Sequence, residues 1–303
     1  MDNAAKMTTK DRLIRGIAMD GKVRAFAVRT TQLVEELRRR HDTFPTTTAA
    51  LGRTVTAAAM MGAMLKGEEK LTVQVKGDGP IGQIIADANA KGEVRGSVKN
   101  PHVQTPSKRP GKMDVAAAVG TTGYIHVTKD LGMKEPYSGS APLISGEIAE
   151  DFTYYFAVSE QTPSAVGLGV LVDEDNSVIV AGGFIIQLMP GLSEEEISAI
   201  EQSIGRFPPV TSLLDQGMEL DEMLRWIVPD VKVLDEMDIM FACHCSRERV
   251  ERTLISLGRE ELEEMRDSGD DEEEVICEFC NEVYKFSRED IDELIKRLDK
   301  TDE

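Results

Sequence analysis

The chain has 303 residues, of which 41% are hydrophobic and 29% charged, and its formal net charge is −19. This length provides one substantial domain and one or two small ones, so the fold as a whole needs no disulfide cross-links. Residues 191–303 hold 33 of the 54 Asp and Glu but only 13 of the 35 Lys and Arg, and this acidic part argues against nucleic acid as a partner.

Neither the N-terminus nor any apolar run predicts export or membrane insertion. Met1 to Leu13 is polar and charged, without the apolar stretch of a signal peptide. The longest uninterrupted apolar run, Ala57 to Leu65 counting Gly62, is too short to span a bilayer. We therefore expect a soluble, cytoplasmic protein with no membrane partner.

Residues 1–190 alternate between strand and helix patterns without a regular βαβ repeat. Strands are predicted over 22–28, 71–76, 124–127, 152–158, 166–172 and 177–189. Helices are predicted over 31–40 and over the Ala- and Met-rich stretch 46–66, which Pro45 opens. The last two strands flank the turn Asp173-Glu174-Asp175-Asn176 and predict a closing hairpin. We therefore predict an α+β core domain over residues 1–190.

Residues 77–82, Gly-Asp-Gly-Pro-Ile-Gly, match the spacing of a dinucleotide-binding loop. Too few residues separate this motif from the next turn, Lys91-Gly92, to hold a loop and a crossover helix. Pro80 also suits a turn. The motif therefore predicts a hairpin connection and no nucleotide site.

After Pro190-Gly191 the composition becomes acidic and the predicted helices become short. Ser193 and Glu196 form a capping box, and Pro208-Pro209 interrupt the helical pattern before a second helix that Pro229 closes. Isolated helices of this length are marginal in water. Residues 191–235 are therefore predicted to be a helical linker that depends on what it packs against. Sequence alone favours an ordinary docked linker over a switch.

The four cysteines lie in the last fifth of the chain, as Cys243-His244-Cys245 and Cys277-Glu278-Phe279-Cys280, with 31 residues between the pairs. Two such pairs can surround one tetrahedral ion, so the pattern predicts a four-cysteine zinc site with one Zn²⁺ per chain. Four sulfurs complete the tetrahedron, and we expect His244 to orient the site or face solvent. Four separate buried thiols or two structural disulfides are the weaker alternatives.

The zinc-bearing segment, residues 236–303, has few large apolar side chains. Ser246 and Gly258 bound one predicted helix, and Ser287 with Asp290 open the last. About sixty residues of this composition cannot build much of a core. Zinc must supply the folding free energy, which for structural sites is roughly 10–16 kcal/mol.

Two other functions are compatible with a four-cysteine segment. A zinc-ribbon nucleic-acid binder needs clustered cations, but Arg247, Arg249 and Arg252 lie among acidic residues. A thiol-disulfide oxidoreductase would use Cys277 and Cys280 in a thioredoxin-like βαβ unit, where one pair suffices. Both remain alternatives.

Several short motifs are spread over both the core and the cysteine segment. They are 50–53 (ALGR), 77–82 (GDGPIG), 151–155 (DFTYY), 159–161 (SEQ), 182–190 (GGFIIQLMP), 243–249 (CHCSRER), 257–258 (LG), 260–262 (EEL) and 277–281 (CEFCN) with Tyr284 and Phe286. Through these motifs the chain closely resembles the redox-regulated 33-kilodalton heat-shock chaperones of bacteria. The resemblance covers essentially residues 11–298, with no departure at the four cysteines.

The resemblance implies a holdase, an ATP-independent chaperone and not an enzyme, that binds unfolding client proteins. In that family the reduced, zinc-bound form is inactive. Oxidants convert the four thiolates to two disulfides and release zinc, the zinc domain and the linker unfold, and the active state forms homodimers. The resemblance implies an α+β core, a metastable linker over 191–235 and a redox-sensing zinc domain over 236–303.

We expect the two disulfides to link Cys243 to Cys245 and Cys277 to Cys280. Neighbouring sulfurs in an unfolding segment meet more often than sulfurs that are 31 residues apart. A Cys243–Cys245 disulfide would close a short ring. The order in which the two disulfides form is therefore left open, and this one could be the second.

Overall fold

The computed structural model describes residues 10–107, 112–268 and 272–299. The chain divides into two compact units, Met1–Ala242 and Cys243–Glu303, which are described separately. Among the described residues, no helix is both long and apolar enough to cross a membrane.

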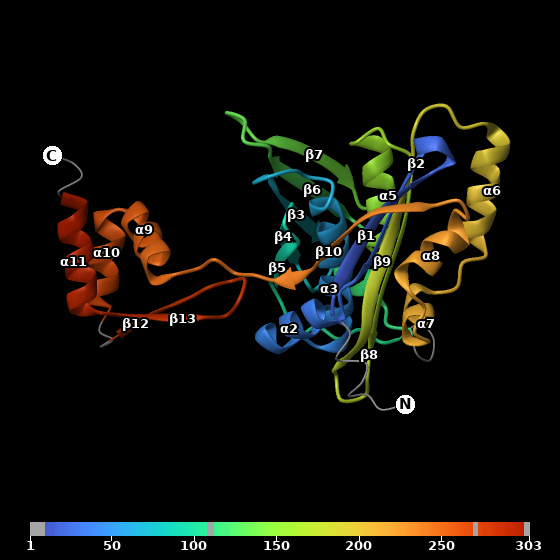
Figure 1. Cartoon of the computed structure of the whole chain (residues 1–303). Coiled ribbons are helices and arrows are strands. Elements are labelled where there is room, and N and C mark those ends of the chain that lie inside the picture. The colour runs from blue at the N-terminus through green and yellow to red at the C-terminus, as the bar shows by residue number, and fades with distance from the viewer. Residues whose placement is uncertain (1–9, 108–111, 269–271, 300–303) are drawn as a thin grey trace. The chain divides into compact units, whose positions relative to one another are not determined.

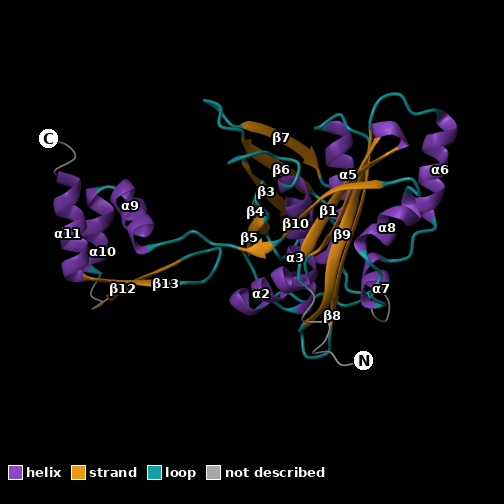
Figure 2. Ribbon diagram, viewed as in Figure 1, coloured by secondary structure: helices purple, strands orange, loops and turns teal. Residues whose placement is uncertain are grey.

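The first unit contains two sheets (Figures 1 and 2). Its strands are β1 (Arg12–Ala18), β2 (Val23–Arg29), β3 (Lys70–Gly77), β4 (Gln83–Asn89), β5 (Glu93–Val98), β6 (Gly123–Asp130), β7 (Tyr137–Pro142), β8 (Ser164–Val172), β9 (Val178–Leu188), β10 (Lys232–Asp238) and β11 (Met240–Phe241). One sheet has the order β10-β1-β2-β9-β8 and the other β11-β5-β4-β3-β6-β7. Every described pairing is antiparallel except that of β11 with β5. The predicted α+β class is confirmed.

Helix α3 (Pro45–Gly62) forms the centre of the first unit. It contacts β4 and β5 of one sheet and β8 and β9 of the other, and nearly all its residues are buried. Its many Ala, Thr and Gly residues allow this close approach, because small side chains let a helix lie near two sheets at once. The shorter α2 (Thr31–His41), η1 (Met19–Gly21) and α4 (Val115–Val119) complete this part of the fold.

The predicted hairpins are confirmed. Residues 77–82 connect β3 to its antiparallel neighbour β4, and residues 173–176 connect β8 to β9. The glycine-rich motif is therefore a strand connection, as its spacing predicted.

The strand predicted over residues 152–158 is wrong, because these residues form helix α5 (Ala149–Val158). Phe152, Tyr155 and Phe156 are buried together at helical spacing, which outweighs the apparent alternation. Asp151 fixes the start of this helix. Its buried carboxylate accepts N–H bonds from Ile144 at 2.7 Å and from Ser145, Gly146 and Ile148 in the preceding loop.

The residues of the predicted linker form α6 (Glu194–Gly205), α7 (Val210–Asp215), α8 (Leu220–Ile227) and then β10. The Ser193–Glu196 capping box is present, with Glu196 N to Ser193 Oγ at 3.2 Å. The three helices cover the face of the five-stranded sheet opposite α3 (Figure 1). The linker's return to the sheet as β10 was not predicted, since its sequence, Lys-Val-Leu-Asp-Glu-Met-Asp, lacks an alternating apolar pattern.

Asp11, which is 1% exposed, supports the start of α2 from a distant part of the chain. Its carboxylate accepts N–H bonds from Gln32 at 3.1 Å and Leu33 at 2.7 Å. Burial raises the pKa of Asp11 to about 7, against the opposing effect of these hydrogen bonds. The folded state therefore retains a proton that the unfolded chain, with an ordinary pKa of 3.8, has already lost.

We predict that Asp11 makes the first unit less stable as pH rises from about 4 to about 7. Between these values the folded state binds more protons, so the free energy of unfolding falls with pH, by at most about 1.4 kcal/mol per pH unit from this group. Urea unfolding followed by circular dichroism at pH 5 and pH 8 should show a smaller decrease in Asp11→Asn than in the parent protein. If the free energy of unfolding decreases equally in Asp11→Asn and in the parent protein, Asp11 is ionised throughout this pH range.

Candidate metal centre

Both cysteine pairs lie in the second unit, which contains α9 (Arg247–Leu257), α10 (Arg259–Asp267), β12 (Glu272–Ile276), β13 (Val283–Ser287) and α11 (Arg288–Asp299). Its buried apolar cluster is small and consists of Leu254, Leu262, Phe286, Ile291, Leu294 and Ile295. The expected scarcity of core side chains in this segment agrees with that cluster.

The second cysteine pair lies in the tight turn between β12 and β13. Cys277 N donates to Glu282 O at 3.0 Å, and Asn281 N donates back to Cys277 O at 2.8 Å. Asn281 has a φ of 56°, a left-handed conformation that Asn tolerates better than most residues. The turn therefore presents Cys277 and Cys280 together.

The first pair immediately precedes α9. Ser246 caps that helix by accepting the Arg249 N–H at 3.3 Å, as the sequence predicted. The Arg249 guanidinium donates to His244 O at 2.7 Å, which holds the backbone between the two cysteines. The His244 residue itself is exposed, and the compact sulfur cluster does not include its ring.

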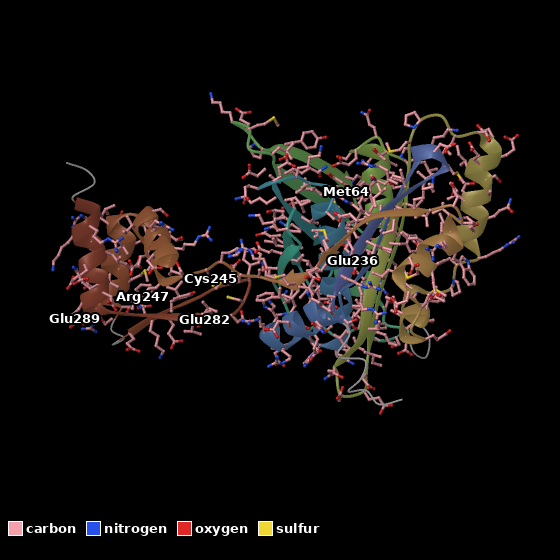
Figure 3. The ribbon with its side chains drawn as sticks, viewed as in Figure 1. Met64, Glu236, Cys245, Arg247, Glu282 and Glu289 are labelled. Carbon is pink, nitrogen blue, oxygen red and sulfur yellow. The ribbon has the colours of Figure 1, made fainter. Side chains whose placement is uncertain are left out.

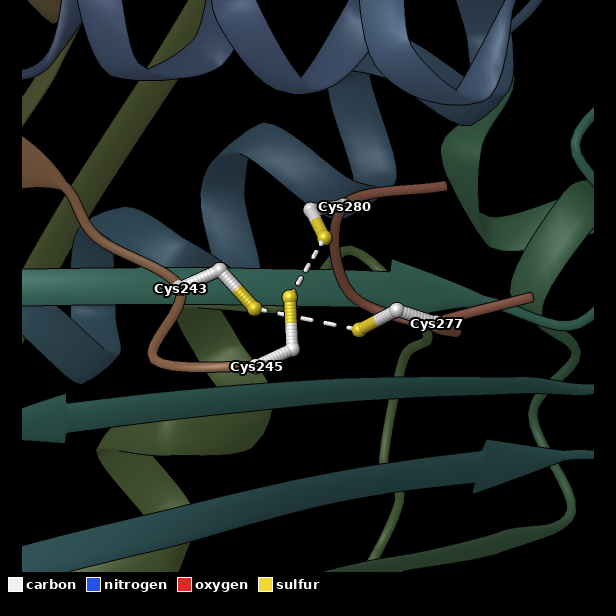
Figure 4. Close-up of side chains that lie close together, drawn as sticks. All are labelled: Cys243, Cys245, Cys277 and Cys280. Carbon is white, nitrogen blue, oxygen red and sulfur yellow. Dashed lines mark hydrogen bonds between the residues drawn. The ribbon is translucent and has the colours of Figure 1, made fainter. Parts of the chain in front are cut away.

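The four Sγ atoms lie within 4.8 Å of one another (Figure 4). Cys243 Sγ is 3.8 Å from Cys277 Sγ, and Cys245 Sγ is 3.3 Å from Cys280 Sγ. Zinc–sulfur bonds of about 2.3 Å in a tetrahedron separate sulfurs by about 3.8 Å, whereas a disulfide requires about 2.05 Å. The four cysteines thus form no disulfide and are arranged at the spacing of a four-sulfur metal site.

The burial of the site sets the cost of forming the thiolates that a bound cation needs. Burial raises the pKa of both Cys277 and Cys280, so as isolated thiols they would keep their protons at neutral pH. A soft divalent cation such as Zn²⁺ would offset this cost by stabilising the thiolates. The residues present therefore fit a Zn(Cys)₄ group.

Arg247 joins the first cysteine pair to the rest of the second unit. Its guanidinium donates to Lys285 O at 2.7 Å, pairs with Asp290 at 2.9 Å and lies 4.4 Å from the centre of the Phe286 ring. Figure 3 labels this side chain close to Cys245. The sequence marks Arg247 as a cation and as part of the motif 243–249, but no local pattern reveals its contacts with residues about forty positions later.

The expected zinc ligands thus come together as one cluster at the place that the spacing indicated. Comparison with known proteins then identifies the family. The model of the family described as Hsp33 protein matches residues 11–287. The chain belongs to the Hsp33 family of chaperones.

Individual relatives agree with this assignment. The chain is 57% identical over 291 residues to proteins named 33 kDa chaperonin from Bacillus cereus and Bacillus anthracis, covering 95% of this chain and 100% of theirs. The crystal structure of the 33 kDa chaperonin (HSP33) of Thermotoga maritima matches with a TM-score of 0.90 and 40% identity, over 97% of this chain and 100% of that one.

Tyr284 is a further residue of this Hsp33 site whose contact with the cysteines was not predicted. A hydrogen bond to the Cys245 sulfur raises the pKa of its hydroxyl, so an O–H donor lies beside this ligand. Hydrogen bonds to a ligating atom lower its reactivity and stabilise the bound metal.

We predict that Tyr284→Phe makes the cysteine site react faster with oxidants. Loss of the O–H donor leaves the Cys245 sulfur more nucleophilic, and outer contacts of this kind change metal affinity by about 10-fold to 100-fold. The rate of zinc release under a fixed hypochlorite excess should rise, with Tyr124→Phe, on β6 of the first unit, as the matched control. Identical rates for the two variants would show that Tyr284 does not protect the sulfur.

Proposed function

We propose that this chain is an ATP-independent holdase that is inactive while reduced and zinc-bound and is activated by oxidation. The observation that carries the proposal is the four-cysteine cluster, which lies in a unit whose buried apolar cluster has six members among the residues that the structure describes. A unit with so small a core depends on the metal for its fold. The same sulfurs that bind the metal are the atoms that oxidants attack.

Oxidation removes the ligands of the metal. Each pair of thiolates that reacts with one hypochlorous acid gives one disulfide, one chloride and one hydroxide, and the sulfurs lose two electrons. Two such reactions consume all four thiolates and release Zn²⁺. The second unit then loses roughly 10–16 kcal/mol of metal-binding free energy, more than most domains have in reserve.

The linker helices cover apolar surface that a client could bind. The sheet side of this surface consists of Ile14, Ala18, Val23, Ala25, Ala27, Val180, Phe184 and Ile186. The linker side is contributed mainly by Ile200, Val210, Leu213, Leu214, Leu220, Met223, Leu224 and Ile227. Phe207, at the proline break, packs on Phe184 of the sheet with ring centres 5.1 Å apart. Unfolding of the linker would expose both sides to unfolding clients.

We also propose that the protein acts in the cytoplasm and forms homodimers when oxidised. The family membership supports binding of unfolded proteins in place of catalysis. The position of Cys277 and Cys280 in a turn between two strands also argues against an oxidoreductase, whose reactive pair opens a helix.

The direct test measures bound zinc and suppression of aggregation of a thermally unfolding protein before and after hypochlorite. Reduced protein should carry one zinc per chain and suppress little aggregation. Oxidised protein should have lost its zinc and should suppress aggregation strongly. Cys277→Ser should lose most of its zinc. Zinc-loaded, reduced protein that already suppresses aggregation fully would refute the proposed regulation.

Disulfide mapping after oxidation tests whether the second unit unfolds. In the folded cluster the 3.8 Å and 3.3 Å contacts join sulfurs of different pairs. In an unfolding segment the close neighbours meet more often, so we predict Cys243–Cys245 and Cys277–Cys280 bridges. Predominant bridges between the two pairs would indicate oxidation within an intact fold.

We predict that Ile200→Asp activates the reduced protein in part. Ile200 is the buried residue of α6, and a carboxylate there would be desolvated without a partner, at a cost of several kcal/mol. Chaperone activity should appear while the zinc content stays normal. Ser198→Asp, on the exposed face of the same helix, is the matched control and should stay inactive. Full inactivity of reduced Ile200→Asp would show that linker docking does not restrain activity.

A further inference from the structure

Strand β10 is an unusual edge strand, because backbone pairing and surface charge hold it in place with little burial. Six of its seven residues are exposed, and Met237 is half-buried. It pairs antiparallel with β1, from Arg12 opposite Asp238 to Ile17 opposite Lys232. Leu234, where the register shifts, is 61% exposed. Few apolar contacts therefore resist its departure.

The charges on the two strands are complementary. Arg12 donates to Glu236 at 2.9 Å and also pairs with Glu219 in front of α8, and Arg15 lies 2.9 Å from Asp235. Lys10 pairs with Asp238 at the end of the ladder. Figure 3 labels Glu236 on β10. β1 thus presents a row of cations to an acidic strand.

Gly16 allows the close approach of β10 at the register shift. A Cβ atom on Gly16 would lie 2.7 Å from Lys232 O and 3.0 Å from Val231 Cγ2. The backbone at Lys232 would have to move, since a main-chain atom cannot avoid such a contact by rotating. The three atoms nearest to this Cβ position all belong to residues 231 and 232. An added Cβ would therefore collide with the linker and not with the neighbouring strand β2.

We propose that β1 is a docking strand for clients, which an extended, acidic segment of an unfolding polypeptide joins in the place of β10. This inference rests on the proposed function, because it requires that the linker leave the sheet. A vacated β1 would present unpaired backbone N–H and C=O groups beside Arg12 and Arg15. Backbone pairing accepts almost any extended sequence, which suits a chaperone with many clients. The cations would favour segments that carry Asp or Glu, as β10 itself does.

The test uses two short peptides of alternating Val and Thr, one with Asp at both ends and one with Lys. Hydrogen exchange on the oxidised protein should show weak protection of those amides of residues 12–18 that face β10, since the amides that face β2 stay paired. The Asp peptide should restore this protection while α6–α8 stay exposed. A bound peptide that leaves these amides unprotected would overturn the inference. Oxidised protein that holds no client at all would overturn the proposed function and this inference with it.

Charge reversal supplies the matched variants. In oxidised protein, the double variant Arg12→Glu/Arg15→Glu should bind the Asp peptide about tenfold more weakly and the Lys peptide more tightly. Arg24→Glu, an exposed change on β2 of the same sheet, should leave both affinities unchanged. If Arg12→Glu/Arg15→Glu and Arg24→Glu bind each peptide with the same affinity, the inference is also overturned. In the reduced protein, Gly16→Ala should speed hydrogen exchange of the β10 amides, because the added Cβ atom would collide with Lys232 O. Unchanged exchange of β10 would overturn its assignment as a closely packed covering strand.

Discussion

The second unit is organised around four cysteine sulfurs that lie within 4.8 Å of one another and fit one tetrahedral cation. Burial raises the pKa of the Cys277 and Cys280 thiols, and among the described residues the buried apolar cluster of this unit has six members. Arg247 links the first cysteine pair to β13 and α11, so the ligands and the core are one connected structure. Under the proposed function, a reaction at sulfur would therefore change the folding of the whole unit.

The first unit has the opposite character. Its central helix is buried between two sheets, and its largest core cluster does not involve the linker helices. The linker helices use a separate cluster on the outer face of the five-stranded sheet, and β10 adds mainly backbone pairing and surface charge. This division explains how one segment could leave a sheet that itself stays folded.

Local signals allowed much of this to be predicted from the sequence. The cysteine spacing, the caps at Ser193 and Ser246 and the turns of the hairpins each depend on residues that are close in the chain. The features that were not predicted come from contacts between residues farther apart in the chain. Asp11 supports α2, and β10 pairs with a strand more than two hundred positions earlier. The wrong prediction over residues 152–158 has a local cause. In α5, buried aromatic residues at helical spacing resembled a strand because every residue from Phe152 to Phe156 except Thr153 is aromatic.

The central claim is that loss of the metal unfolds the linker and leaves the core intact. Hydrogen exchange followed against zinc release during oxidation tests it most directly. The account predicts that the amides of α6, α7 and α8 lose protection as zinc leaves, while α3 and the central strands β2, β9, β3 and β4 remain protected. Linker helices that stay protected in fully oxidised, zinc-free and active protein would contradict it.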